Sequence, residues 1–75
     1  MNNLRRMQIK RAIQLLEQAK EVLDGVLDEE SNAFDNLPES IQQSSRGEQM
    51  EDNVDKLQET IDLIDEAQDA LENIE

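Results

Sequence analysis

The sequence predicts an all-α fold: an antiparallel helical hairpin, similar to a coiled coil, that dimerises into a four-helix bundle. Its 75 residues include two glycines, one proline and one aromatic residue, a composition typical of helices rather than strands. Apolar residues recur every three or four positions in two long segments, as they do on one face of a helix. Pro38 lies between these segments and would interrupt a continuous helix. Residues 1–75 are therefore expected to form one hairpin domain.

The first helix is predicted from about residue 3 to about residue 35. Its apolar stripe consists of Ile9, Ala12, Ile13, Leu16, Ala19, Leu23, Val26 and Leu27, and it continues to Ala33 and Phe34. Asn2 or Asn3 could accept a hydrogen bond from the first turn and cap the helix. Gly25 lies inside this helix. It is either tolerated there at a cost of about 1 kcal/mol, or it marks a bend or the close approach of another backbone.

Residues 36–45 are predicted to connect the two helices, because Pro38 lacks the N–H group that a helix interior needs. Proline is common in a first helical turn, so a short helical turn is expected after it. Ser45 and Glu48 have the spacing of a capping box, in which the serine side chain accepts from the Glu48 N–H and the Glu48 side chain bonds back. The second helix is therefore expected from about residue 46 to residue 75.

The second helix carries an apolar seam with alternating steps of four and three residues. Its members are Met50, Val54, Leu57, Ile61, Ile64, Leu71 and Ile74. This spacing is the heptad pattern of a helix that packs against a partner helix. Gln68 stands where the next apolar residue is expected. A single polar residue in a seam can fix the register, but the preferred interpretation is that Ala67 replaces Gln68 as the seam drifts around the helix.

Charge is distributed unevenly, and the distribution favours the antiparallel arrangement. Residues 1–20 carry +4, residues 21–47 carry −6 and residues 48–75 carry −10, for a net charge of −12. An antiparallel hairpin places the cationic start of the chain beside its acidic end. Ion pairs are expected between the cations Arg5, Arg6, Lys10 and Arg11 and the acids Asp65, Glu66, Asp69 and Glu72. The alternative is a parallel dimer of longer helices that fold back less.

The apolar residues outnumber those that one partner helix can cover. Leu4, Leu15, Val22 and Leu63 fall on the flanks of the two stripes, where a single hairpin would leave them in water. A second hairpin packed on the first would bury them. We therefore predict a homodimer with these four residues in its interface. Disulfides cannot take over this role, because the chain has no cysteine.

The residue types argue against several functions. Without histidine or cysteine, and with its serines at a predicted turn and cap, the chain is not expected to be an enzyme. No loop has the ligand spacing of a calcium site, so neither a metal nor another cofactor is expected. The net charge of −12 disfavours direct binding of nucleic acid. The alternative is a weak nucleic-acid accessory protein using the four cations near its start.

No membrane span and no signal peptide are expected, because no apolar run is long enough. The cytoplasm of a bacterial host cell is the predicted location.

The second helix also carries a row of acids at intervals of three or four residues. They are Asp55, Glu59, Asp62, Asp65, Glu66, Asp69 and Glu72, with Asp52 preceding them. One interpretation is a solubilising exterior. The other is an electrostatic decoy that occupies the basic groove of a nucleic-acid-binding protein. Asn36, Leu37, Pro38 and Glu39, in the exposed connector, are the second predicted partner-binding group, because loops often carry binding residues.

Two motifs in the middle of the chain carry a resemblance to a protein family. They are Asn-Leu-Pro-Glu-Ser at residues 36–40 and a Ser-x-Arg-Gly-Glu-type element matched by Ser45, Arg46, Gly47 and Glu48. With the acidic tail that follows, roughly residues 28–75 resemble small acidic helical proteins of phages, prophages and mobile elements of Firmicutes. No functional site is carried over from that family. The resemblance implies a mobile-element setting, in which small acidic helical proteins often bind and disarm host factors.

The predicted function is therefore non-enzymatic protein binding. In the mobile-element setting, the chain would inhibit a host defence or nucleic-acid-processing protein that has a basic surface. The alternative is a homo-oligomeric scaffold or accessory protein with no regulatory target.

Overall fold

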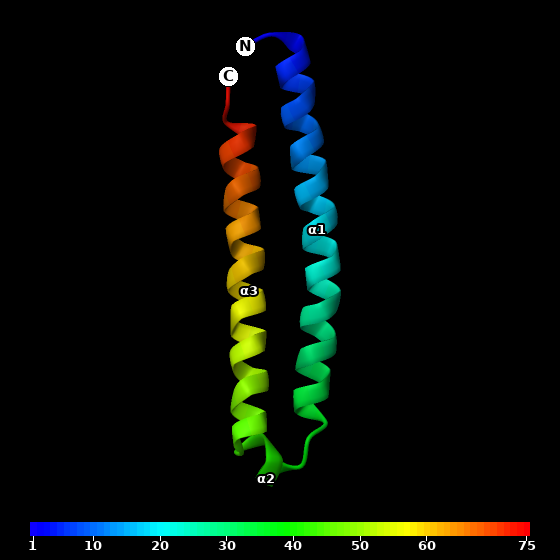
Figure 1. The fold of residues 1–75 in the computed structure, drawn as a ribbon, viewed down its shortest axis with the longest axis vertical. Coiled ribbons are helices and arrows are strands. Elements are labelled where there is room, and N and C mark those ends of the chain that lie inside the picture. The colour runs from blue at the N-terminus through cyan, green and yellow to red at the C-terminus, as the bar shows by residue number, and fades with distance from the viewer.

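The computed structural model describes residues 1–75 and shows a helical hairpin. Helix α1 spans Asn3–Asp35, the short helix α2 spans Glu39–Gln42, and α3 spans Ser45–Glu72. Helices α1 and α3 lie antiparallel and side by side, with both termini at one end and α2 at the other (Figure 1). The molecule measures 58 × 15 × 12 Å. The predicted antiparallel hairpin is confirmed, and the alternative of longer helices that fold back less is wrong for this chain.

Helix α1 begins and ends where the sequence predicts. The Oδ1 atom of Asn2 accepts a hydrogen bond of 2.8 Å from the Arg5 N–H, so Asn2 rather than Asn3 is the cap. At the other end, the Asn36 N–H still donates to the Asn32 carbonyl at 3.0 Å. The chain then leaves the helix two residues before Pro38, as the proline ring requires.

The connector forms one helical turn that leans on the end of α1. The Pro38 carbonyl accepts from the N–H groups of Ile41 and Gln42 at 2.9 and 3.0 Å, which starts α2 directly after the proline. The Gln42 Nε2 atom donates to the Phe34 carbonyl at 3.1 Å. This bond ties the turn to a carbonyl in the last turn of α1 that also accepts from the Leu37 N–H at 3.0 Å.

The predicted capping box is wrong by one residue. Ser44, not Ser45, caps α3: its Oγ atom accepts from the Gly47 N–H at 3.5 Å and also donates to the Ile41 carbonyl. The Glu48 N–H bonds to the Ser44 backbone carbonyl at 3.0 Å instead. Gly47, in the first turn of α3, lies directly against the backbone of α2.

The two glycines have opposite surroundings. A Cβ atom on Gly47 would lie 2.0 Å from the backbone oxygen of Gln42, so only glycine fits at this contact. A Cβ atom on Gly25 would have no neighbour within 4 Å. The interpretation of Gly25 as a site of close approach is therefore wrong, and the required close approach occurs at Gly47.

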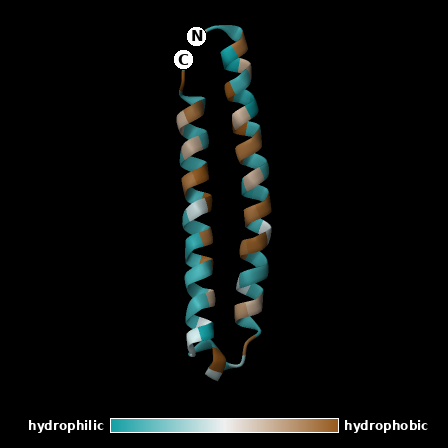
Figure 2. Cartoon of the chain, in the orientation of Figure 1, coloured by the Kyte–Doolittle hydropathy of each residue, from teal (hydrophilic) through white to brown (hydrophobic).

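The core between α1 and α3 is thin. Only Gly47, Ile61 and Gln68 are buried. Most other residues of the two predicted stripes are half-buried, whereas Ala19, Val26, Ala33 and Ile74 are exposed. Hydrophobic segments recur along both helices between longer hydrophilic stretches (Figure 2). Gln68 is 8% exposed whereas Ala67 is exposed, so the expectation that Ala67 takes this seam position is wrong. The glutamine amide stays in the seam because it finds hydrogen-bond partners there.

The two glycines provide a matched test of the hairpin. Gly25→Ala should raise the free energy of unfolding by about 0.5–1 kcal/mol, because alanine favours the helix and nothing obstructs it. Gly47→Ala should lower it by about 1–3 kcal/mol, because the added methyl group displaces α2. Urea unfolding followed by circular dichroism measures both. Equal effects of the two substitutions would contradict the contact between Gly47 and Gln42.

Candidate functional site

The seam between α1 and α3 divides each helix into two flanks of different chemistry. At about 100° per residue, Asp62 and Asp69 fall on one flank of α3, and Leu63 falls on the other. On α1, the seam likewise divides Asp28 on one flank from Val22 on the other. Because the helices are antiparallel and share one seam, the two apolar flanks lie on the same side of the hairpin. We call this side the apolar face; its members are Leu4, Leu15, Ala19, Val22, Val26, Leu63, Ala67 and Ala70.

The opposite flank and the outer side of α3 carry the predicted row of acids. We call it the acidic strip; it consists of Asp55, Glu59, Asp62, Asp65, Glu66, Asp69 and Glu72. All seven residues are exposed. Asp65 pairs with Lys20 at 2.7 Å and Glu59 with Lys56 at 3.7 Å, while the other five make no ion pair. Five of the seven carboxylates are thus free to meet a partner.

The four cations near the start of α1 do not neutralise the strip. The three ion pairs of the chain involve only Lys20 and Lys56, so the predicted pairing of Arg5, Arg6, Lys10 and Arg11 with the acidic end of α3 is wrong. Arg6 instead donates to the backbone carbonyls of Glu75 and Met1, at 3.2 and 3.3 Å. Glu72 lines the same cleft as Arg6 and Lys10 but forms no ion pair with either of them.

A cleft of about 760 Å³ lies at the open end of the hairpin, where the helix ends carry no covering turn. It is lined by Met1, Asn3, Arg6, Met7, Ile9, Lys10, Ile13, Gln14, Leu71, Glu72 and Ile74. None of its polar side chains is buried. The cleft therefore lacks the fixed polar group that orients a small ligand in most binding sites.

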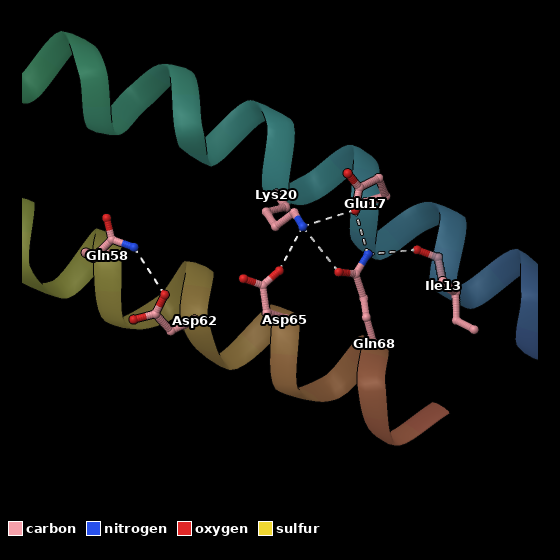
Figure 3. A network of polar contacts seen from close by, with 7 residues as sticks. All are labelled: Ile13, Glu17, Lys20, Gln58, Asp62, Asp65 and Gln68. Atoms are coloured by element: carbon pink, nitrogen blue, oxygen red, sulfur yellow. Dashed lines mark hydrogen bonds and ion pairs between the residues drawn. The ribbon is translucent and has the colours of Figure 1, made fainter. Parts of the chain in front are cut away.

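A network of four polar side chains crosses the seam at the middle of the hairpin (Figure 3). Lys20 Nζ lies 2.7 Å from Asp65 Oδ1, 3.2 Å from Glu17 Oε2 and 3.4 Å from Gln68 Oε1. Gln68 Nε2 donates to Glu17 Oε2 at 2.8 Å and to the Ile13 carbonyl at 3.4 Å. We call Glu17, Lys20, Asp65 and Gln68 the cross-helix network. It satisfies Gln68 and fixes which residues of α1 and α3 stand opposite each other.

The network stabilises the charged forms of two of its members. Hydrogen bonds from Gln68 and Lys20 hold the pKa of Glu17 below its usual value. Hydrogen bonds to Asp65 and Glu17 raise the pKa of Lys20 above its usual value. Sequence reasoning missed Glu17 and Lys20 as a structural group. Lys20 could have been found, because it interrupts the apolar steps of α1 as Gln68 interrupts those of α3.

The connector residues predicted to bind a partner lie apart from the acidic strip. Asn36, Pro38 and Glu39 are exposed, while Leu37 is half-buried. Asp55, the first acid of the strip, is ten residues beyond the start of α3, which is about 15 Å along the helix. The connector and the strip are thus two separate surfaces.

The hairpin offers neither a cluster of metal ligands nor a membrane-spanning helix. No three acidic side chains converge into a group that could bind a metal ion. None of the helices combines the length and the hydropathy that crossing a bilayer requires. Protein-family models, curated proteins and solved structures all gave no match to this chain. The resemblance to mobile-element proteins therefore stays a prediction.

The cross-helix network predicts how stability changes with pH. Folding lowers the pKa of Glu17 from its usual value of 4.5. The Glu17 carboxylate therefore stabilises the hairpin at pH values above 4.5, and this stabilisation is lost as the pH falls through the pKa of the folded state. Lys20 shows the opposite dependence. Its stabilisation of the hairpin is fully present below pH 10.5 and is lost as the pH rises through its raised pKa. Glu17→Gln should therefore reduce the fall in melting temperature between about pH 5 and about pH 3.

Glu21→Gln is the matched control, since Glu21 is exposed on α1 outside the network. Thermal unfolding followed by circular dichroism across this pH range gives both slopes. If the two variants flatten the slope equally, the effect belongs to net charge, and the network does not link Glu17 to folding.

Proposed function

We propose that the chain is a non-enzymatic protein-binding module that docks its acidic strip on a basic, nucleic-acid-binding surface of another protein. The observation that carries the proposal is the row of seven exposed carboxylates on one helix, five of them without an ion pair. A protein that used these acids only for its own folding would pair them with its own cations. Here Arg5, Lys10 and Arg11 make no ion pair at all.

The density of charge along the strip supports a mimic of nucleic acid. From Asp55 to Glu72 the helix rises about 26 Å, so its seven carboxylates follow one another about every 4 Å. Phosphates along one strand of duplex DNA follow at about 3.4 Å. A groove whose cations are spaced for phosphates would therefore meet a carboxylate at a similar interval.

The hairpin also holds the strip in a fixed shape. All seven acids lie on one continuous helix of 28 residues, which packs along α1 and is tied to it by the cross-helix network. A partner therefore does not have to order the backbone that presents the charges, and less binding free energy is lost on association.

The biological setting is also part of the proposal. The resemblance of residues 28–75 to small acidic proteins of phages and mobile elements supports an inhibitor of a host defence or nucleic-acid-processing protein in the bacterial cytoplasm. In this role the chain would occupy the groove that otherwise binds nucleic acid, and the connector at Asn36–Glu39 would add contacts at the end of the hairpin.

A second candidate function is a homo-oligomeric scaffold, and the apolar face favours it. Leu15, Val22 and Leu63 are each about half exposed or more, which is unusual for large apolar residues that share one face of a small molecule. A scaffold needs no free acidic strip. The two candidates therefore differ in whether a change of the strip alters function.

The strip can be tested with two sets of charge reversals on the two long helices. Asp62→Lys, Glu66→Lys and Asp69→Lys change three unpaired acids of the strip. Glu21→Lys, Asp24→Lys and Asp28→Lys make the same change in net charge on α1. Each chain is immobilised, a bacterial lysate is passed over it, and bound protein is eluted with a 30-base-pair DNA duplex at constant ionic strength. We expect wild type and the α1 set to release basic proteins, and the strip set to bind them about 10–100-fold more weakly.

Two results would contradict the proposal. Elution by poly-glutamate as efficient as elution by the duplex would show that captured proteins do not use a nucleic-acid site. Equal losses in the strip and α1 sets would show that net charge, rather than the strip, attracts them.

A further inference from the structure

The apolar face is the largest feature of the hairpin that the acidic strip does not explain. Its large members have exposed fractions of 63% for Leu4, 48% for Leu15, 67% for Val22, 42% for Val26 and 56% for Leu63. They come from both long helices and lie on one side. Exposure of such a face to water is unfavourable, because removing apolar surface from water lowers the free energy of the protein.

The broad side of the hairpin that carries the apolar face is large enough for a stable dimer interface. The broad side of the hairpin, 58 by 15 Å, covers roughly 900 Å², and a standard protein interface buries about 800 Å² on each partner. The large apolar residues Leu15, Val22, Val26 and Leu63 lie in the middle of this side, as in the apolar core of an interface, and Leu4 extends the apolar surface towards the open end. A second copy of the chain presents the same pattern and needs no further partner.

We infer that two hairpins pack through their apolar faces end over end, so that the open end of one lies on the connector end of the other. The inference does not depend on the proposed binding function of the acidic strip. In this arrangement α1 packs on the partner's α1 and α3 on the partner's α3, each pair antiparallel. The two-fold axis crosses the middle of the hairpin.

The residue spacing fits a single two-fold axis. On α1, Leu15 and Val22 are equidistant from position 18.5, with Ala19 beside that point. On α3, Leu63 and Ala70 are equidistant from position 66.5, with Ala67 beside it. Lys20 contacts Asp65 and Glu17 contacts Gln68, so residues whose numbers add up to 85 stand at the same level. Positions 18.5 and 66.5 satisfy this rule, and small alanines there let the two helix pairs approach closely.

The apolar residues alone would also permit a same-end dimer, in which α1 packs on the partner's α3. Charge decides between the two. At the open end, +4 from residues 1–20 and −5 from residues 64–75 leave a net charge of −1. At the connector end, −6 from residues 21–47 and −5 from residues 48–63 leave −11.

A same-end dimer would place the two −11 halves about 10 Å apart, the usual distance between packed helices. The end-over-end dimer separates their centres by about 30 Å, three Debye lengths at 0.1 M salt. Each −11 half then lies on a −1 half. The electrostatic repulsion between the two copies is therefore smaller in the end-over-end dimer than in the same-end dimer, and the charge distribution favours the end-over-end dimer.

The end-over-end dimer also turns the two acidic strips outward, on opposite sides of the assembly. Packing through the apolar face then leaves both strips free, and one assembly can hold two partners. Salt should act on the two interactions in opposite directions. It screens the repulsion between two chains of −12 and strengthens the dimer, whereas it weakens binding of the strip to a basic partner.

Single cysteines test the arrangement, because the chain has none of its own. In the end-over-end dimer the two copies of Ala19 lie beside the axis, within the distance of about 7 Å that a disulfide can span. Oxidised Ala19→Cys should therefore form a covalent dimer. Gln14→Cys, on the same helix but on the opposite side of the hairpin, is the control and should stay largely uncrosslinked.

The alternatives give different products. Light scattering of the wild type at micromolar concentration should give twice the mass of one chain. The dimer should become more stable as the salt concentration rises from about 50 mM to about 500 mM. A mass of one chain would overturn the inference. A second experiment mixes Ala19→Cys chains with ¹⁵N-labelled Ala67→Cys chains. If Ala19→Cys crosslinks only to Ala67→Cys, and neither variant crosslinks to itself, the dimer is the same-end dimer and the inference is overturned. Equal crosslinking of Gln14→Cys would show random collision and overturn it as well.

Discussion

The single seam between two antiparallel helices is the constraint on which the rest of this structure depends. Two helices share one line of contact, so each can cover only a narrow stripe of the other, and only three residues of the chain are buried. A seam of this kind cannot hold all the apolar side chains that the sequence supplies. Helical spacing puts the surplus on one flank of each helix, and the antiparallel arrangement places these two flanks on the same side of the hairpin. The exposed apolar face therefore follows from the spacing and the topology together.

The seam is also where the register of the hairpin is fixed. Half-buried aliphatic side chains could pair in several registers, because a shift by one heptad brings similar residues together. Lys20 and Gln68 permit only one register without leaving buried polar atoms unpaired, and no buried side-chain polar atom lacks a partner. Polar residues in the seam thus give up some burial of apolar area and define the level at which each flank residue lies. The symmetry of the apolar face about its centre depends on that level.

Much of the hairpin could be predicted from the sequence because its signals are local. The periodic stripes, Asn2 as a possible cap and the single proline depend on neighbours within four residues, and the bounds of α1 followed from them. The start of α3 was missed by one residue, because Ser44 and Ser45 are equivalent as caps until the position of α2 selects between them. The ion pairs predicted for Arg5 and its neighbours do not form, because charge totals give the proximity of two segments and not the direction of side chains.

The sequence by itself determined the helices, the reversal at Pro38, the acidic row and the exposure of Leu4, Leu15, Val22 and Leu63, since each depends on composition and helical spacing. Only the tertiary structure decided that Gly47 faces the Gln42 backbone, that Gln68 rather than Ala67 occupies the seam, and that Lys20 joins Glu17 to Asp65. The physical reason is distance along the chain. These contacts join α2 or α1 to α3 through the rotation of each helix about its own axis, and that rotation is set by packing between segments.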